Sequence, residues 1–194
     1  MTRPGGKRQE WLSSRWARPT IAAALAVPLL LGGAFVSVDR LHNSASDVLD
    51  HPVNPVSDEQ SRAQVVESAK HVVTTAGLQT TNAGYLLMSC KDRDDPPYQG
   101  AIYLTFALPA GEHADTYFPA IARALVAHGW TEGSPPNDHV FGKTLTKDNV
   151  IAITYPERDD KSQGVLRLYG QCQNMTDHRT DTNAWIDITG QLKP

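Results

Sequence analysis

The chain has 194 residues, of which 40% are hydrophobic and 20% charged, and its formal net charge is −3. This length suits one domain with appended segments, and the composition excludes collagen-like, low-complexity and wholly disordered chains. The charge is unevenly placed, because residues 1–39 have a net charge of +3, which leaves −6 for residues 40–194. Phosphate binding needs clustered cations, so no nucleic-acid partner is expected for this acidic body.

An uncharged, largely apolar run, PTIAAALAVPLLLGGAFVSV, occupies residues 19–38 and follows a basic stretch. About twenty such residues span a bilayer as a helix, and the preceding cations favour a cytoplasmic N-terminus. We therefore predict a basic cytoplasmic tail over 1–18 and a single transmembrane anchor over 19–38 in the plasma membrane, with a periplasmic or extracellular body. A cleaved signal peptide has the same layout, with Gly32-Gly33-Ala34 near the cleavage site, and a buried core helix is a third interpretation.

A linker and then a helix follow the apolar run. Residues 39–56 are rich in Ser, Asn, Asp and Pro without a sustained period, which indicates a linker, and the exported domain is expected over 57–194. Ser57 and Gln60 match a capping box, which predicts a helix that begins directly after Ser57. Valine and alanine then recur at helical spacing until Gly77, which can end the helix in a left-handed conformation.

Five strands and a second helix are predicted beyond Gly77. The segment DTYFPAIARALVAHG carries apolar residues on one helical stripe, and Lys147-Asp148-Asn149 predicts a tight hairpin because Asp and Asn tolerate turn geometry. The order of elements predicts an α+β domain with one mostly antiparallel sheet of about five strands, two helices on one face, and a preceding transmembrane helix. The predicted strands cover residues 83–90, 100–108, 139–146, 149–156 and 164–172.

Cys90 and Cys172 are the two cysteines, and export to an oxidising compartment predicts a disulfide between them. Two buried free thiols are the alternative, and the absence of a Cys-x-x-Cys pair disfavours redox catalysis. Counting by twos, Cys90 shares a strand face with Leu86, and Cys172 shares one with Leu168. This parity predicts that both sulfurs point to the apolar face and that the first and last strands are neighbours, bridged under the helices.

The disulfide would bring two polar segments, KDRDD and TDHRTD, to one end of the domain. Calcium prefers several hard oxygen ligands, but neither segment has the spacing of a calcium loop. A weak Ca²⁺ site, solvated polar turns and a partner surface therefore remain alternative interpretations. No other cofactor and no catalytic residue are predicted, since the histidines lack zinc spacing and no nucleophile motif is present. The candidate ligand or cation cluster consists of Asp92, Asp94, Asp95, Asp177, His178 and Asp181.

Three tyrosines form a candidate binding face. Tyr85, Tyr103 and Tyr169 have the strand parity opposite to the cysteines and the aliphatic row, so we expect them on the solvent side of the sheet. Tyrosines on an open sheet can bind a peptide, glycan or lipid, although ordinary cross-strand pairs are the alternative.

Several segments resemble mycobacterial lipoproteins of the LppJ type over roughly residues 57–194. They are DEQSRAQVVESAK, SCKDRDDPPYQG, HGW, QCQNMTDHRTD and ITGQLKP. Such lipoproteins carry a lipobox whose cysteine is lipidated after export, whereas the corresponding run here, PLLLGGAFV, has no cysteine. Lipidation is therefore not expected, and the apolar run is favoured as an anchor. The resemblance implies an actinobacterial cell-envelope protein and brings no catalytic residues.

Two classes of function follow. The favoured one is a non-enzymatic, membrane-anchored envelope domain that binds a partner protein, glycan or lipid. The alternative is a metal-dependent or hydrolytic envelope enzyme that uses the Asp and His cluster. A deep pocket lined by those side chains would favour the enzyme, whereas a shallow sheet face with dispersed carboxylates would oppose it.

Overall fold

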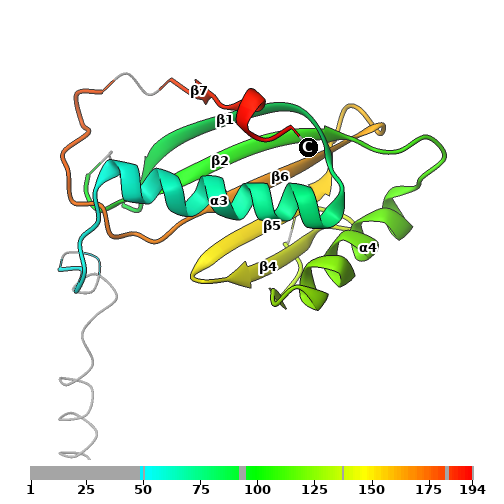
Figure 1. The fold of residues 1–194 in the computed structure, drawn as a ribbon, viewed down its shortest axis with the longest axis horizontal. Coiled ribbons are helices and arrows are strands. Elements are labelled where there is room, and N and C mark those ends of the chain that lie inside the picture. The colour runs from blue at the N-terminus through cyan, green and yellow to red at the C-terminus, as the bar shows by residue number, and fades with distance from the viewer. Residues whose placement is uncertain (1–48, 50, 92–94, 137, 182–183, 194) are drawn as a thin grey trace, which may run out of the picture. The chain divides into compact units, whose positions relative to one another are not determined.

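The computed structural model describes residues 49, 51–91, 95–136, 138–181 and 184–193 (Figure 1). The predicted cytoplasmic tail, the anchor and most of the linker lie outside these residues. Among the helices that are described, none is both long and apolar enough to cross a bilayer.

Helix α3 (Asp58–Ala76) begins and ends where the sequence predicts. The Gln60 N–H donates to Ser57 Oγ at 3.3 Å, and the Ser57 N–H donates to Gln60 Oε1 at 2.8 Å, which completes the capping box. Gly77 has a φ of 64°, and its N–H donates to the Val73 carbonyl to close the last turn. The predicted apolar stripe is buried under the helix: Val65, Val66, Ala69, Val72 and Val73.

The sheet is antiparallel and has seven strands in the order β3-β4-β5-β6-β2-β1-β7. The five predicted strands correspond to β1, β2, β4, β5 and β6, and the two further strands are two-residue edges, too short to show an alternating pattern. The bounds are β1 (Gln79–Ser89), β2 (Tyr98–Ala107), β3 (Thr131–Glu132), β4 (Lys143–Lys147), β5 (Val150–Pro156), β6 (Gln163–Tyr169) and β7 (Ile186–Asp187).

Two turns flank β4. The predicted hairpin to β5 is confirmed, with Asp148 and Asn149 as its two loop residues at φ values of 48° and 59°. The start of the strand was wrongly predicted, because residues 139–142 form a turn instead. Phe141 has a φ of 62°, and the Gly142 N–H donates to the His139 carbonyl at 3.0 Å. This conformation is uncommon for a bulky side chain, so the sequence carried no sign of it.

Helix α4 (Ala114–Ala127) completes the helical layer. It contacts α3, and the two helices pack on the same face of the sheet, α3 against β1 and β2 and α4 against β4 and β5 (Figure 1). Phe106 of β2 and Phe118 of α4 meet in the core with ring centroids 6.1 Å apart. The domain is therefore a two-layer α+β structure, as predicted, with a sheet wider than predicted.

The predicted side-chain parity of β1 is wrong. Tyr85 pairs with Ile102 of β2 and is 4% exposed in the core under the helices. Leu86 and Met88 alternate with it and lie on the face away from the helices, and Cys90 has their parity. Both rows of β1 are apolar, so residue type alone could not decide which row faces the helices.

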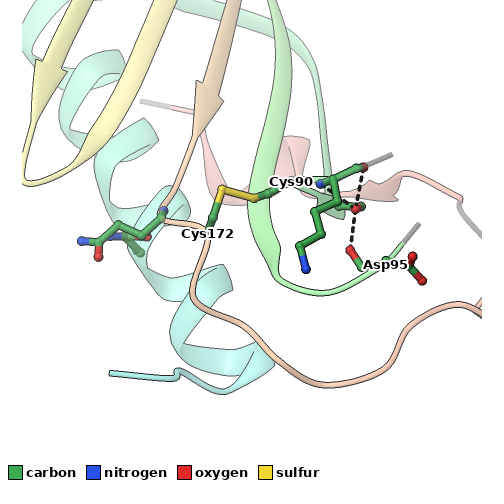
Figure 2. The surroundings of a disulfide bond; sticks show 7 residues. Cys90, Asp95 and Cys172 are labelled. Carbon is green, nitrogen blue, oxygen red and sulfur yellow. Dashed lines mark hydrogen bonds between the residues drawn. A yellow bond between two sulfur atoms is a disulfide. The ribbon is translucent and has the colours of Figure 1, made fainter. Parts of the chain in front are cut away.

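The disulfide between Cys90 and Cys172 is confirmed, with Cα atoms 6.0 Å apart, although β2 lies between β1 and β6 (Figure 2). The prediction of neighbouring first and last strands is therefore wrong. The bond can form because the chain turns after β6 and runs beside the start of β2. There Asn174 and Tyr98 exchange backbone hydrogen bonds of 2.7 and 3.1 Å.

Replacing both cysteines by serine should lower the free energy of unfolding by about 3–5 kcal/mol, because the bond closes a long loop between cysteines with a sequence separation of 82. Urea denaturation of the full chain measures the loss. A reductant should lower the free energy of unfolding of the wild type by the same amount and leave that of the C90S/C172S variant unchanged. A loss below about 1 kcal/mol would show that noncovalent contacts alone hold this corner.

Candidate functional site

The polar corner beside the disulfide contains the predicted Asp and His cluster, which divides into two parts. In the first part, the Arg179 guanidinium donates to both oxygens of Asp177 at 2.9 and 2.6 Å and lies 3.7 Å from Asp95. The side-chain and backbone hydrogen bonds from Arg179 lower the pKa of Asp177 to about 2. Asp92 and Asp94 lie outside the described residues. These contacts fit the interpretation of solvated polar turns.

His178 is in the second part and is only 9% exposed. Its Nδ1 lies 2.7 Å from Asp181 Oδ2 and its Nε2 lies 3.1 Å from Asp58 Oδ1, while the ring packs edge-on against Tyr98 at a centroid distance of 4.9 Å. Burial acts to lower the pKa of His178, but the hydrogen bonds and charges of Asp181 and Asp58 outweigh it and raise the pKa. In the protonated ring, which this shift favours, both nitrogens can donate, one to each carboxylate.

Asp58 is the part of this arrangement that sequence reasoning missed. It is the first residue of α3, and it also accepts a 2.7 Å hydrogen bond from Asn174 Nδ2. Burial acts to raise the pKa of Asp58, but the hydrogen bond from Asn174 and the charge of His178 outweigh it and lower the pKa. The contact ties the start of α3 to the segment after the disulfide. No local sequence pattern indicates that Asp58 has a partner 120 residues away along the chain.

Among the described carboxylates of the corner, Asp95 and Asp177 contact Arg179, and Asp58 and Asp181 contact His178. Within the described ranges, no group of three or more His, Cys, Asp or Glu side chains is placed to hold a metal ion. Four hollows of the described surface are lined by other residues. The contacts of His178 thus connect the start of α3 to the segment that follows the disulfide. The His178 latch consists of Asp58, Asn174, His178 and Asp181.

The face of the sheet opposite the helices presents a different kind of site. Tyr103 and Tyr169 lie on this open face, as predicted, whereas Tyr85 does not. A hollow of about 230 Å³ opens between β1, β2, β6 and the segment before β7. Its lining is almost entirely aromatic and aliphatic: Met88, Ala101, Ile102, Tyr103, Arg167, Tyr169 and Trp185.

Trp185 forms one wall of this hollow and is 50% exposed. Its ring lies against the backbone of β1 at Gly84, where an added Cβ would come within 3.1 Å of Trp185 Cε3, and it meets Tyr103 edge-on at 6.3 Å. The glycine thus makes room for the indole. Trp185 could not be placed from the sequence, because the strand beside it has only two residues.

Arg167 lies in the floor of the open face. Its guanidinium carbon is 5.5 Å from the ring centre of Tyr103 and 5.6 Å from that of Tyr155, which is a cation–π arrangement. Burial, with the carboxylate of Glu157 beside its hydroxyl, raises the pKa of Tyr103, so this ring stays neutral at physiological pH. Arg167 is the charged residue within the otherwise largely apolar segment GVLRLYG, and this position is a sequence signal for a site on the open face.

Fold and site together define a small, disulfide-closed α+β domain with an aromatic sheet face that none of the described helices covers. Residues 57–191 match the family described as "Putative lipoprotein LppJ", and the chain belongs to this family. It is 41% identical over 178 residues to the "Putative lipoprotein LppJ" of Mycobacterium tuberculosis strain CDC 1551 / Oshkosh, covering 92% of this chain and 93% of the relative. The Mycobacterium bovis protein of that description is 40% identical over the same shares. No solved structure matches the chain.

The His178 latch should weaken as the pH rises. Folding raises the pKa of His178, so the protonated ring stabilises the folded domain. This stabilisation is complete at pH values below the pKa in the unfolded chain, about 6.5, and is lost as the pH rises through the pKa in the folded domain. The free energy of unfolding of the wild type, minus that of His178→Asn, should therefore shrink between about pH 5.5 and about pH 8.5. Urea titrations at both pH values measure this difference.

Asp181→Asn is the matched control, because it removes the first of the two partners that raise the pKa of His178. The pH dependence of its stability should be smaller than that of the wild type. A wild-type advantage over His178→Asn that stays constant or grows with pH would contradict a charged His178 in the folded domain.

Proposed function

We propose that the protein is a membrane-anchored binding domain of the cell envelope and that its open sheet face contacts a partner protein. Membership of a lipoprotein family supports an envelope location. The apolar run at residues 19–38 supports a retained anchor with the domain on the outer side of the plasma membrane. Each half of this proposal has its own test.

The observation that carries the binding role is the hollow on a sheet face that the helices leave uncovered. Monomeric domains rarely leave a contiguous apolar surface without a purpose. Trp185 and Ile151 are 50% and 42% exposed on this side, and half-buried tyrosines lie between them. Aromatic residues, Met and Arg are enriched at protein interfaces, and Trp, Tyr and Arg dominate their hot spots. A protein is therefore favoured over a glycan or lipid as the partner.

An enzymatic role has no comparable support. The described carboxylates of the polar corner contact Arg179 or His178, which leaves them less available to bind a metal or to activate water. The two parts of the corner therefore contribute to the stability of the fold in this proposal, and the open face contributes the function.

Photo-crosslinking tests the binding face. A benzophenone amino acid in place of Tyr169 should give light-dependent protein adducts in the native envelope, whereas the same residue in place of Lys70, on the exposed side of α3, should not. Adding Trp185→Ala to the Tyr169 variant should reduce the adduct severalfold if the hollow is the contact. Adducts of equal yield from both positions, or none from Tyr169, would rule the open face out.

Mass spectrometry and protease protection test the anchor. The membrane-bound protein should retain residues 1–38, and protease added to intact spheroplasts should remove the domain while sparing the N-terminal tail. A mature protein that begins after residue 34 would instead show cleavage of a signal peptide. A domain protected from external protease would overturn the proposed topology.

A further inference from the structure

Arg167 is the one charged residue in the lining of the hollow. Burying a cation among apolar groups is unfavourable unless an anion or a hydrogen-bond acceptor compensates for the lost water. The floor supplies one neutral acceptor, the Tyr169 hydroxyl, which is hydrogen-bonded to the Arg167 guanidinium, but the lining of the hollow contains no anion. The positive charge of Arg167 therefore has no counter-charge in the lining, which packing alone does not explain.

The neighbours of Arg167 fix its position without neutralising its charge. The rings of Tyr103 and Tyr155 flank the guanidinium, and burial raises the pKa of both tyrosines, so neither carries a negative charge near neutral pH. Within the described ranges, the ion pairs do not include Arg167, and its buried Nε has no hydrogen-bond partner.

Glu157 is the carboxylate beside this cluster, and it is already engaged. One of its oxygens accepts from the Tyr103 hydroxyl at 3.4 Å, and the other accepts from the Arg158 N–H at 2.7 Å. The flanking rings hold the Arg167 side chain in place before a ligand arrives, which lowers the entropy cost of forming an ion pair.

The size of the hollow limits its occupant. At about 230 Å³ it is smaller than the 300–1,000 Å³ typical of pockets for whole small molecules, so it suits one side chain of a larger partner. Met88 and Trp185 form apolar walls, which favour an occupant with apolar surface next to its charge. The body of the chain is acidic, so a strongly acidic partner surface would be repelled at long range.

We propose that the hollow receives one Asp or Glu side chain, flanked by apolar residues, from the partner protein. The carboxylate pairs with Arg167, and the flanking residues pack against Trp185 and Tyr169. The Arg–carboxylate pair supplies specificity because two parallel hydrogen bonds fix its geometry. This inference rests on the proposed binding function and adds the kind of side chain that the open face binds.

Two probes of nearly equal shape test the charge requirement. 3-Phenylpropionate and 3-phenylpropionamide are each titrated into the ¹⁵N-labelled full chain in nonionic detergent, and the Trp185 indole and Arg167 Nε signals are followed. The carboxylate should shift both signals and bind about tenfold or more tightly than the amide, which is the scale of one charge-assisted pair. Phenyl phosphate serves as a third probe.

Arg167→Gln should bring the affinities for the carboxylate and the amide to near equality. Arg158→Gln removes an exposed arginine outside the hollow and should keep the wild-type preference. The comparison of the probes on the wild type does not depend on any variant, so the inference stays testable if Arg167→Gln fails to fold.

Equal binding of both probes would overturn the carboxylate preference and leave the open face as a binder of apolar groups. Binding of neither probe would also overturn it, and crosslinking at Tyr169 would then decide the proposed function separately. A clear preference for phenyl phosphate over the carboxylate would assign the hollow to a phosphorylated ligand, such as a lipid headgroup, and would overturn the proposed Asp or Glu side chain.

Discussion

The covalent bond between Cys90 and Cys172 determines where the last part of the domain lies. It holds the chain after β6 against the start of β2, where Asn174 pairs with Tyr98. From that fixed point the segment reaches the start of α3, and His178 bridges Asp58 and Asp181. Farther along, the same segment continues to β7 at the other side of β1. Without this closure, the latch and the wall of the hollow would depend on a long and weakly paired tail.

The two faces of the sheet differ in the side chains that they carry and in whether helices pack on them. On one face, α3 and α4 bury the large apolar side chains and provide most of the stability. Glycine at position 100 lets α3 approach closely, since an added Cβ would lie 2.5 Å from the Ser61 carbonyl oxygen. Among the described residues no helix lies on the other face, and there the rings of Tyr103 and Tyr155 flank the Arg167 guanidinium. If the open face binds a partner as proposed, stability and recognition lie on opposite sides of a single sheet, and changes on the open face should cost little stability.

The sequence predicted those features that depend on local chemistry. The capping box and Gly77 bounded α3, Asp148 and Asn149 marked a hairpin, and the cysteine count with export predicted the disulfide. Features that depend on distant partners could not be predicted. Both rows of side chains in β1 are apolar, so the sequence does not show which face of the sheet Tyr85 lies on. No residue near Asp58 in the sequence indicates its contact with His178. The described members of the predicted cluster lie at one corner, where Arg179 and His178 contact the carboxylates, and the spacing of acidic residues in the sequence does not indicate such contacts.

The point where the chain enters the domain has a mechanical consequence. The Val56 N–H donates to the Gln173 carbonyl at 3.0 Å, so the entering strand runs parallel to the residues that follow Cys172. A pull on the N-terminal side of Val56 would load this backbone contact and the disulfide beside it before it reached α3. Tension along the chain would thus be shared by this isolated backbone bridge and by the covalent crosslink beside it. A domain tethered at this end could bear force from its partner without unwinding its first helix.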